Sequence, residues 1–97
     1  MSYQDKLREA WRLQMLKLLN SLPSYKAGQY FLYQCMTTGE IPPPSADQVE
    51  TEMHWLSDQG YVELTAVGQM QEAKITQRGI DIAEGRSIVP GVARVRP

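Results

Sequence analysis

The spacing of the hydrophobic residues changes at Gly60, and this change restricts the chain to a mixed α and β fold. Before Gly60, apolar side chains recur every three or four residues, as they do on one face of a helix. After Gly60, residues 61–65 alternate apolar and polar side chains, as a half-buried strand does. We therefore predict an α+β fold that is mainly α with a small β-hairpin.

The length of the chain limits it to one domain. Its 97 residues can bury a single hydrophobic core. We expect one domain over residues 1–97, with its core at about 5–85 and a partly ordered C-terminal tail at 86–97. No apolar run approaches the roughly 18 residues that a membrane span needs, and the single cysteine, Cys35, cannot form an intramolecular disulfide. We expect a cytoplasmic protein that does not bind a membrane.

The part of the chain before Gly60 divides into three predicted helices. The first covers residues 5–19, the second runs from about residue 25 to 36 after an N-cap at Ser24, and the third spans about 46–59. At the start of the third helix, Ser45 and Gln48 have the spacing of a capping box.

After Gly60 the sequence predicts a hairpin and one more helix. Residues 61–65 form the first strand, a turn follows at 68–69, and residues 71–75 return antiparallel. Thr76 then has the position of an N-cap for a short helix at 77–84.

The first helix carries more apolar residues than one buried face requires. Leu7, Trp11 and Met15 form one stripe, while three leucines lie off it: Leu13, Leu16 and Leu19. A helix that is apolar nearly all round needs cover on two sides. Either a C-terminal segment of the same chain folds over it, or these leucines form a dimer interface. Both explanations stay open, and we expect a homodimer.

Charge is segregated along the chain, although the net charge is only −1. Between Lys26 and Lys74 there is no Lys or Arg, but seven acidic residues: Glu40, Asp47, Glu50, Glu52, Asp58, Glu63 and Glu72. A phosphate backbone is bound mainly through Lys and Arg. The residues between Lys26 and Lys74 are therefore poorly suited to bind nucleic acid.

Two stretches carry a resemblance to a known superfamily. Leu56-Ser57-Asp58-Gln59-Gly60-Tyr61-Val62-Glu63-Leu64 and Ile75-Thr76-Gln77-Arg78-Gly79 resemble winged helix-turn-helix proteins, at the end of the third helix and at the second wing strand. The resemblance covers about residues 7–85. The chain length, the long apolar first helix and the segment Gly85 to Val92 also resemble small proteins of Mu-like prophages that are labelled arsenical-repressor-like regulators.

The resemblance implies a role for the third helix. In such regulators this helix enters the DNA major groove, the wing contacts the backbone, and the terminal helices often form a dimer. The residues that would face a partner or DNA here are Asp47, Gln48, Glu50, Thr51, His54, Trp55 and Asp58. The possible backbone contacts are Lys74, Arg78, Arg86, Arg94 and Arg96.

The acidic face of the third helix is open to three interpretations. It is a solvated surface, a surface that binds a basic protein partner, or a surface that reads the DNA major groove. The third interpretation has to overcome the charge, because the carboxylates would meet phosphate oxygens of like charge. Trp55 either packs against the core or anchors a partner. Our first hypothesis is a protein-binding use of the scaffold in a phage or prophage, with the partner unknown, and the alternative is a DNA-binding transcriptional regulator.

Residues for catalysis are scarce. The chain has one His and one Cys, no CxxC or HxxxH spacing, and no glycine-rich phosphate loop. His54 is more typical of a surface residue than of a general base, and Cys35 more typical of a core residue than of a redox centre. We expect no enzyme activity, no metal site and no cofactor.

Overall fold

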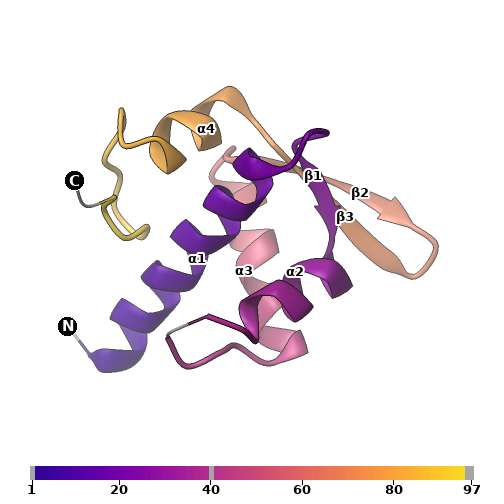
Figure 1. Cartoon of the computed structure of the whole chain (residues 1–97), viewed down its shortest axis with the longest axis horizontal. Coiled ribbons are helices and arrows are strands. Elements are labelled where there is room, and N and C mark those ends of the chain that lie inside the picture. The colour runs from indigo at the N-terminus through magenta and orange to yellow at the C-terminus, as the bar shows by residue number, and fades with distance from the viewer. Residues whose placement is uncertain (1, 40, 96–97) are drawn as a thin grey trace.

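The computed structural model describes residues 2–39 and 41–95, which form four helices and a three-stranded antiparallel sheet (Figure 1). In chain order the elements are α1 (Tyr3–Ser21), β1 (Lys26–Gly28), α2 (Gln29–Met36), α3 (Ala46–Asp58), β2 (Val62–Val67), β3 (Met70–Ile75) and α4 (Gln77–Ala83). The predicted α+β class is confirmed. None of these helices combines the length and the hydropathy that crossing a membrane requires.

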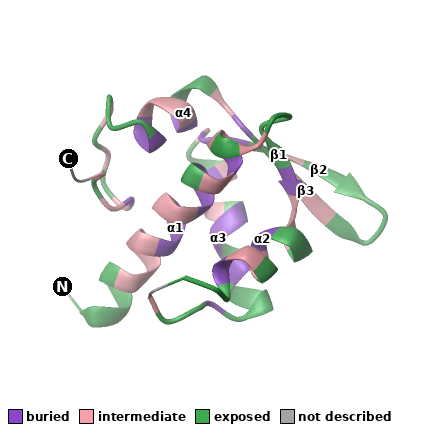
Figure 2. Cartoon of the chain, in the orientation of Figure 1, coloured by how far each residue is buried: buried purple, intermediate pink, exposed green. Residues whose placement is uncertain are grey.

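Helix α1 lies at the centre of the molecule, with α2 and α3 against one side and α4 against another (Figure 1). Buried residues line α1, α3 and the sheet where these elements meet (Figure 2). Leu16 and Leu19 are fully buried in this core. Their assignment to a dimer interface is therefore wrong, because their own chain already covers them. Leu13 is half-buried and stays at the surface.

The second helix begins later than predicted. Tyr25 has a φ of 59°, so the chain reverses there, and Lys26–Gly28 pairs with β3 as a short edge strand. The carbonyl of Tyr25 accepts a bond of 2.9 Å from the amide of Ile75. The prediction of Ser24 as the N-cap of the second helix is consequently wrong. The N-cap of α2 is Gly28, which has no side chain to accept a capping hydrogen bond. The sheet order is β1-β3-β2.

The predicted start of the third helix is confirmed. The amide of Gln48 donates to Ser45 Oγ at 3.1 Å, and the amide of Ser45 donates to Gln48 Oε1 at 2.8 Å, which completes the capping box. The hairpin is also confirmed: β2 and β3 pair from Val62 opposite Ile75 to Val67 opposite Met70. Thr76 caps α4 as predicted.

The described part of the C-terminal tail packs against α1. Val92 is buried, and the amide of Ala93 donates to the carbonyl of Glu9 at 3.1 Å. The first explanation for the apolar first helix is thus correct in part, since a C-terminal segment does cover one side of α1. Arg96 lies outside the described residues.

A close contact at α4 leads to a stability prediction. A Cβ at Gly79 would clash with the carbonyl oxygen of Tyr61 and lie 2.7 Å from Ile75 Cγ1. Gly79→Ala should therefore lower the free energy of unfolding by about 1–3 kcal/mol in a urea titration, as overpacking does. Gly28→Ala is the control, because Gly28 has a φ of −76° and no atom within 4 Å of a Cβ. An equal loss in both variants would contradict this packing.

Candidate binding surface on helix α3

The outward face of α3 is accessible along its whole length. The side chains of Val49, Met53 and Leu56 anchor the helix in the core. Their placement turns six of the predicted site residues to solvent, and all six are exposed: Asp47, Gln48, Glu50, Thr51, His54 and Asp58. No Lys or Arg occurs in α3. The outward face of α3 therefore offers three carboxylates and three neutral polar side chains, and we call these six residues the α3 acidic face.

Trp55 does not belong to this exposed set. The guanidinium carbon of Arg12 lies 3.9 Å from the centroid of the Trp55 ring, and the Tyr61 ring centroid is 6.2 Å away. Gly91 packs so closely on the indole that a Cβ there would lie 2.6 Å from Cζ2. Trp55 is half-buried and packs within its own chain, the first of the two alternatives for this residue.

A buried carboxylate lies on α3 beside Trp55, at the edge of the core. Glu52 is 1% exposed; its Oε1 accepts from Arg12 Nε at 2.7 Å and its Oε2 from Arg8 Nε at 2.8 Å. Arg12 also donates to the carbonyl of Gly91 at 2.8 Å. We call Arg8, Glu52 and Arg12 the Glu52 cluster. A buried charge requires such partners, because its desolvation is otherwise uncompensated.

Sequence reasoning missed the Glu52 cluster, although a signal for it was present. Glu52 lies three residues after Val49 and four before Leu56, so helical spacing places it on the buried stripe. Its charge groups it with the acidic segment instead, which hides this position. Two arginines from the basic N-terminal part are therefore engaged within the chain and are not free to meet a partner through these nitrogens.

The hairpin carries a balanced set of charges. Strand register places Lys26 of β1 and Glu63 of β2 on either side of Lys74 in β3. Lys26 Nζ also lies 3.9 Å from Glu72 Oε1. The predicted contact residue Lys74 is exposed, and β1 adds a second cation beside it that the helical prediction for residues 25–36 did not place there.

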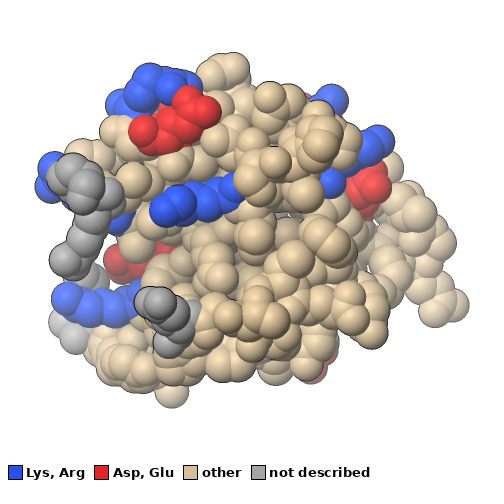
Figure 3. Space-filling view, viewed as in Figure 1, with Lys and Arg blue, Asp and Glu red and all other residues tan. Residues whose placement is uncertain are grey.

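The other predicted basic contacts are dispersed. Arg78 is exposed, with its guanidinium carbon 5.3 Å from the Tyr61 ring centroid. Arg86 donates to Asp81 at 2.8 Å and to Glu84, and Arg94 is exposed. Figure 3 shows basic atoms around the edges and near the centre of one face, without a continuous basic patch.

The ion pairs of Arg86 change the titration of two carboxyls. The pKa of Asp81 lies below its ordinary value because Arg86 and then Gln77 donate hydrogen bonds to it. The pKa of Glu84 is lowered by hydrogen bonds from Asn20 and then Arg86. The hydrogen bonds that Arg86 donates to Asp81 and then to Glu84 raise the pKa of Arg86 itself.

Metal ligands are not grouped in the described structure. Within residues 2–39 and 41–95, no three His, Cys, Asp or Glu side chains are close enough to share an ion. His54 is exposed on α3, and Cys35 is half-buried on α2.

The Glu52 cluster leads to a second prediction. Glu52→Gln should lower the free energy of unfolding by about 3 kcal/mol, because it removes one charge and leaves Arg12 buried beside an uncharged amide. Urea denaturation followed by circular dichroism measures this change. Glu50→Gln makes the same substitution on the exposed face and should change stability by less than about 0.5 kcal/mol. Equal effects of the two substitutions would show that Glu52 is not paired inside the protein.

The third prediction concerns pH. Since Asp81 and Glu84 have lowered pKa values, Arg86 contributes stability that is full above about pH 4.5 and is lost as the pH falls through those lowered values. Arg86→Ala should raise both carboxyl pKa values towards their ordinary 3.8 and 4.5, measured by NMR titration. The stability difference between wild type and variant should shrink as pH falls. Unchanged pKa values in the variant would refute these pairings.

Comparison with known proteins finds a similar phage protein. The chain is 40% identical over 53 residues to the uncharacterized protein gp26 of Escherichia phage Mu. The match covers 55% of this chain and 55% of the phage protein, so the chain spans about half the length of this relative. No family model and no solved structure matches the chain. The similarity to gp26 supports a phage origin.

Proposed function

We propose that the chain is a non-catalytic winged-helix binding protein of phage or prophage origin, and that its α3 acidic face binds a protein partner. Three helices, a hairpin and a closing helix follow one another in the order that the resemblance to winged helix-turn-helix proteins implies, and β1 adds a short edge strand to the hairpin. The β2–β3 hairpin would then be the wing. The proposal places the protein in the cytoplasm and requires no metal or cofactor.

The charge of the exposed α3 residues carries this proposal. Asp47 and Glu50 lie in the first turns of α3, and Asp58 lies at its end, all exposed. A helix docked in the major groove would bring these carboxylates close to phosphate oxygens of like charge. A basic protein surface would instead attract them and speed association. The proposal therefore favours a partner rich in Lys and Arg.

Charge reversal tests the protein-binding proposal. Asp47→Lys with Glu50→Lys should weaken the complex with the basic partner at least about tenfold, because two attractive contacts become repulsive. The partner is sought by pull-down of purified phage proteins, and its affinity is measured by calorimetry at low and high salt. Gln48→Ala with Thr51→Ala alters the same face without changing charge and should retain most of the affinity. Retention by both double variants would exclude the α3 acidic face as the contact surface.

DNA binding is the second candidate, and one observation favours it. Strand β1 places Lys26 directly beside Lys74 of the hairpin, so two neighbouring cations lie on the sheet, one on β1 and one on the wing. Non-specific affinity for duplex DNA lies in the range of roughly 10⁻⁴–10⁻⁶ M at physiological salt and strengthens as salt falls. Typical specific binders make about six to ten phosphate contacts.

Fluorescence anisotropy with a labelled mixed-sequence duplex distinguishes the two candidates. Titrations at about 20 mM and about 150 mM salt exploit the salt dependence of phosphate binding. The DNA-binding candidate requires that the protein binds the duplex at low salt. Lys26→Ala with Lys74→Ala should then reduce the affinity, and Asp47→Lys with Glu50→Lys should increase it. Folded protein that binds no duplex at either salt concentration would eliminate this candidate.

A further inference from the structure

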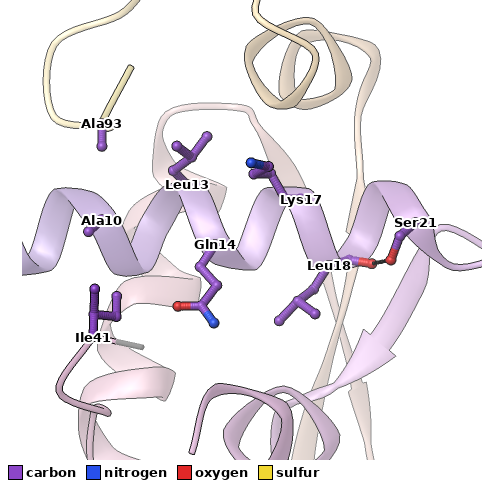
Figure 4. Close-up of a pocket in the computed structure, with 8 residues that line it drawn as sticks. All are labelled: Ala10, Leu13, Gln14, Lys17, Leu18, Ser21, Ile41 and Ala93. Atoms are coloured by element: carbon purple, nitrogen blue, oxygen red, sulfur yellow. Dashed lines mark hydrogen bonds between the residues drawn. The ribbon is translucent and has the colours of Figure 1, made fainter. Parts of the chain in front are cut away.

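The outer edge of β2 and a groove on α1 are both open surfaces in the described part of the chain. The groove has a volume of about 470 Å³ and a mostly apolar lining that includes Leu13, Leu18 and Ile41 (Figure 4). Strand β2 is the last strand of the sheet order β1-β3-β2. An apolar groove accepts occupants of many shapes, whereas the edge of a sheet accepts an extended backbone. The edge of β2 therefore specifies its occupant more narrowly than the groove does.

The edge of the sheet opposite to β2 is closed by its own chain. The amide of Gln71 donates to Gln29 Oε1 at 2.8 Å, and the amide of Ile75 donates to the carbonyl of Tyr25 at 2.9 Å. Strand β1 pairs with residues 72–74 between them. The amides of Gln71 and Ile75 therefore point towards β1 and away from β2.

These two bonds also fix the direction of the backbone groups on β2. Ala66 and Val62 lie opposite Gln71 and Ile75 in the register of the hairpin. Residues opposite each other in antiparallel strands either exchange both backbone bonds or both point outwards. The amides and carbonyls of Val62, Leu64 and Ala66 therefore point away from β3, to the outer edge of β2.

Strand β2 lacks the features that keep an edge strand from pairing. Natural edge strands carry lysines, prolines or bulges for this purpose. β2 contains neither Lys nor Pro, its one charged residue is Glu63, and its register with β3 runs without a bulge. Glu63, Thr65, Ala66 and Val67 are exposed, and the hairpin projects beyond the helices (Figure 1). The outer edge of β2 is therefore accessible to a further strand.

The charge of Glu63 selects the chemistry of that strand. Lys26, Lys74 and Glu63 form one row across the three strands, and the next position in this row belongs to the added strand. Opposite charges directly across a strand pair stabilise it, and like charges destabilise it. A Lys or Arg is therefore favoured opposite Glu63. A second copy of β2 fits less well, because antiparallel pairing centred on Leu64 would bring the two Glu63 carboxylates to diagonal positions.

We propose that the outer edge of β2 binds an extended, basic segment of a protein partner as a fourth, antiparallel strand. The backbone groups of Leu64 and Ala66 hydrogen-bond the segment, and a Lys or Arg of the segment lies opposite Glu63. Val67, which is 56% exposed at the end of β2, faces an apolar side chain of the segment. This inference concerns a different surface from the α3 acidic face and does not depend on the proposed function.

A synthetic peptide tests this strand addition. The probe has the sequence of residues 69–76 with Glu72→Lys and blocked ends, because β3 already matches β2 and places Lys74 opposite Glu63. NMR titration of labelled wild-type protein should show shifts at the amides of Leu64 and Ala66, with a dissociation constant of about 0.1–1 mM. A control peptide that also carries Lys74→Glu should bind about threefold to tenfold more weakly. In Glu63→Gln protein this difference should fall to about twofold or less.

A proline on β2 separates strand addition from other modes of binding. Ala66→Pro removes an outward amide and keeps the bonds to β3, because an edge strand tolerates proline where its amide faces solvent. This variant should lose binding of the probe. Ala66→Val keeps the amide and should bind the probe within about twofold of wild type. Circular dichroism checks that both variants are folded.

Four results would overturn the proposal. One is folded wild-type protein that shows no shifts at about 5 mM probe, above the expected range. Another is equal binding of the two peptides by wild-type protein, which needs no proline variant. Binding that survives Ala66→Pro would show that the probe replaces β3, through the backbone of Glu63 and Thr65, or occupies the α1 groove. Shifts of β2 amides that depend on the concentration of the protein alone would identify a second copy as the occupant.

Discussion

The fold depends on the compensation of one buried carboxylate. Glu52 brings α3 into the core as a charged group, and Arg8 and Arg12 of α1 neutralise it there. The same guanidinium of Arg12 lies over Trp55 and binds the carbonyl of Gly91. One side chain therefore sets the positions of α1, α3 and the C-terminal tail relative to each other. Removal of either charge leaves the other buried, which costs more than a lost surface pair.

The Glu52 cluster also explains which charges of the two segregated blocks remain at the protein surface. In the sequence, the acidic middle segment and the basic ends are separate blocks. Folding removes Glu52 from the acidic block, and it engages two arginines of the basic block at the same time. Asp47, Glu50 and Asp58 remain exposed on α3. The α3 acidic face is thus what remains of the acidic block on α3 after internal pairing.

Local signals made much of the fold predictable. The capping box at Ser45 and the change of period at Gly60 located α3 and the hairpin within a few residues. Strand β1 was not predictable, because three residues are too few to show a period and the reversal depends on the positive φ of Tyr25. The burial of Leu16 was also missed, since a helical wheel shows which residues are apolar but not which neighbours cover them. The exposure of the α3 acidic face followed from spacing alone, whereas the partners of Glu52 required the tertiary fold.

The sequence separations within the Glu52 cluster have a kinetic consequence. Arg12 is 40 residues from Glu52 and 79 residues from Gly91, whereas the β2–β3 hairpin joins residues that are near neighbours in the chain. Distant contacts form more slowly than local ones, because the intervening loop must close first. Helices and hairpin can therefore assemble before the two ends of the chain meet. We therefore expect the contacts of the Arg12 guanidinium with Glu52 and Gly91 to form after the helices that they join.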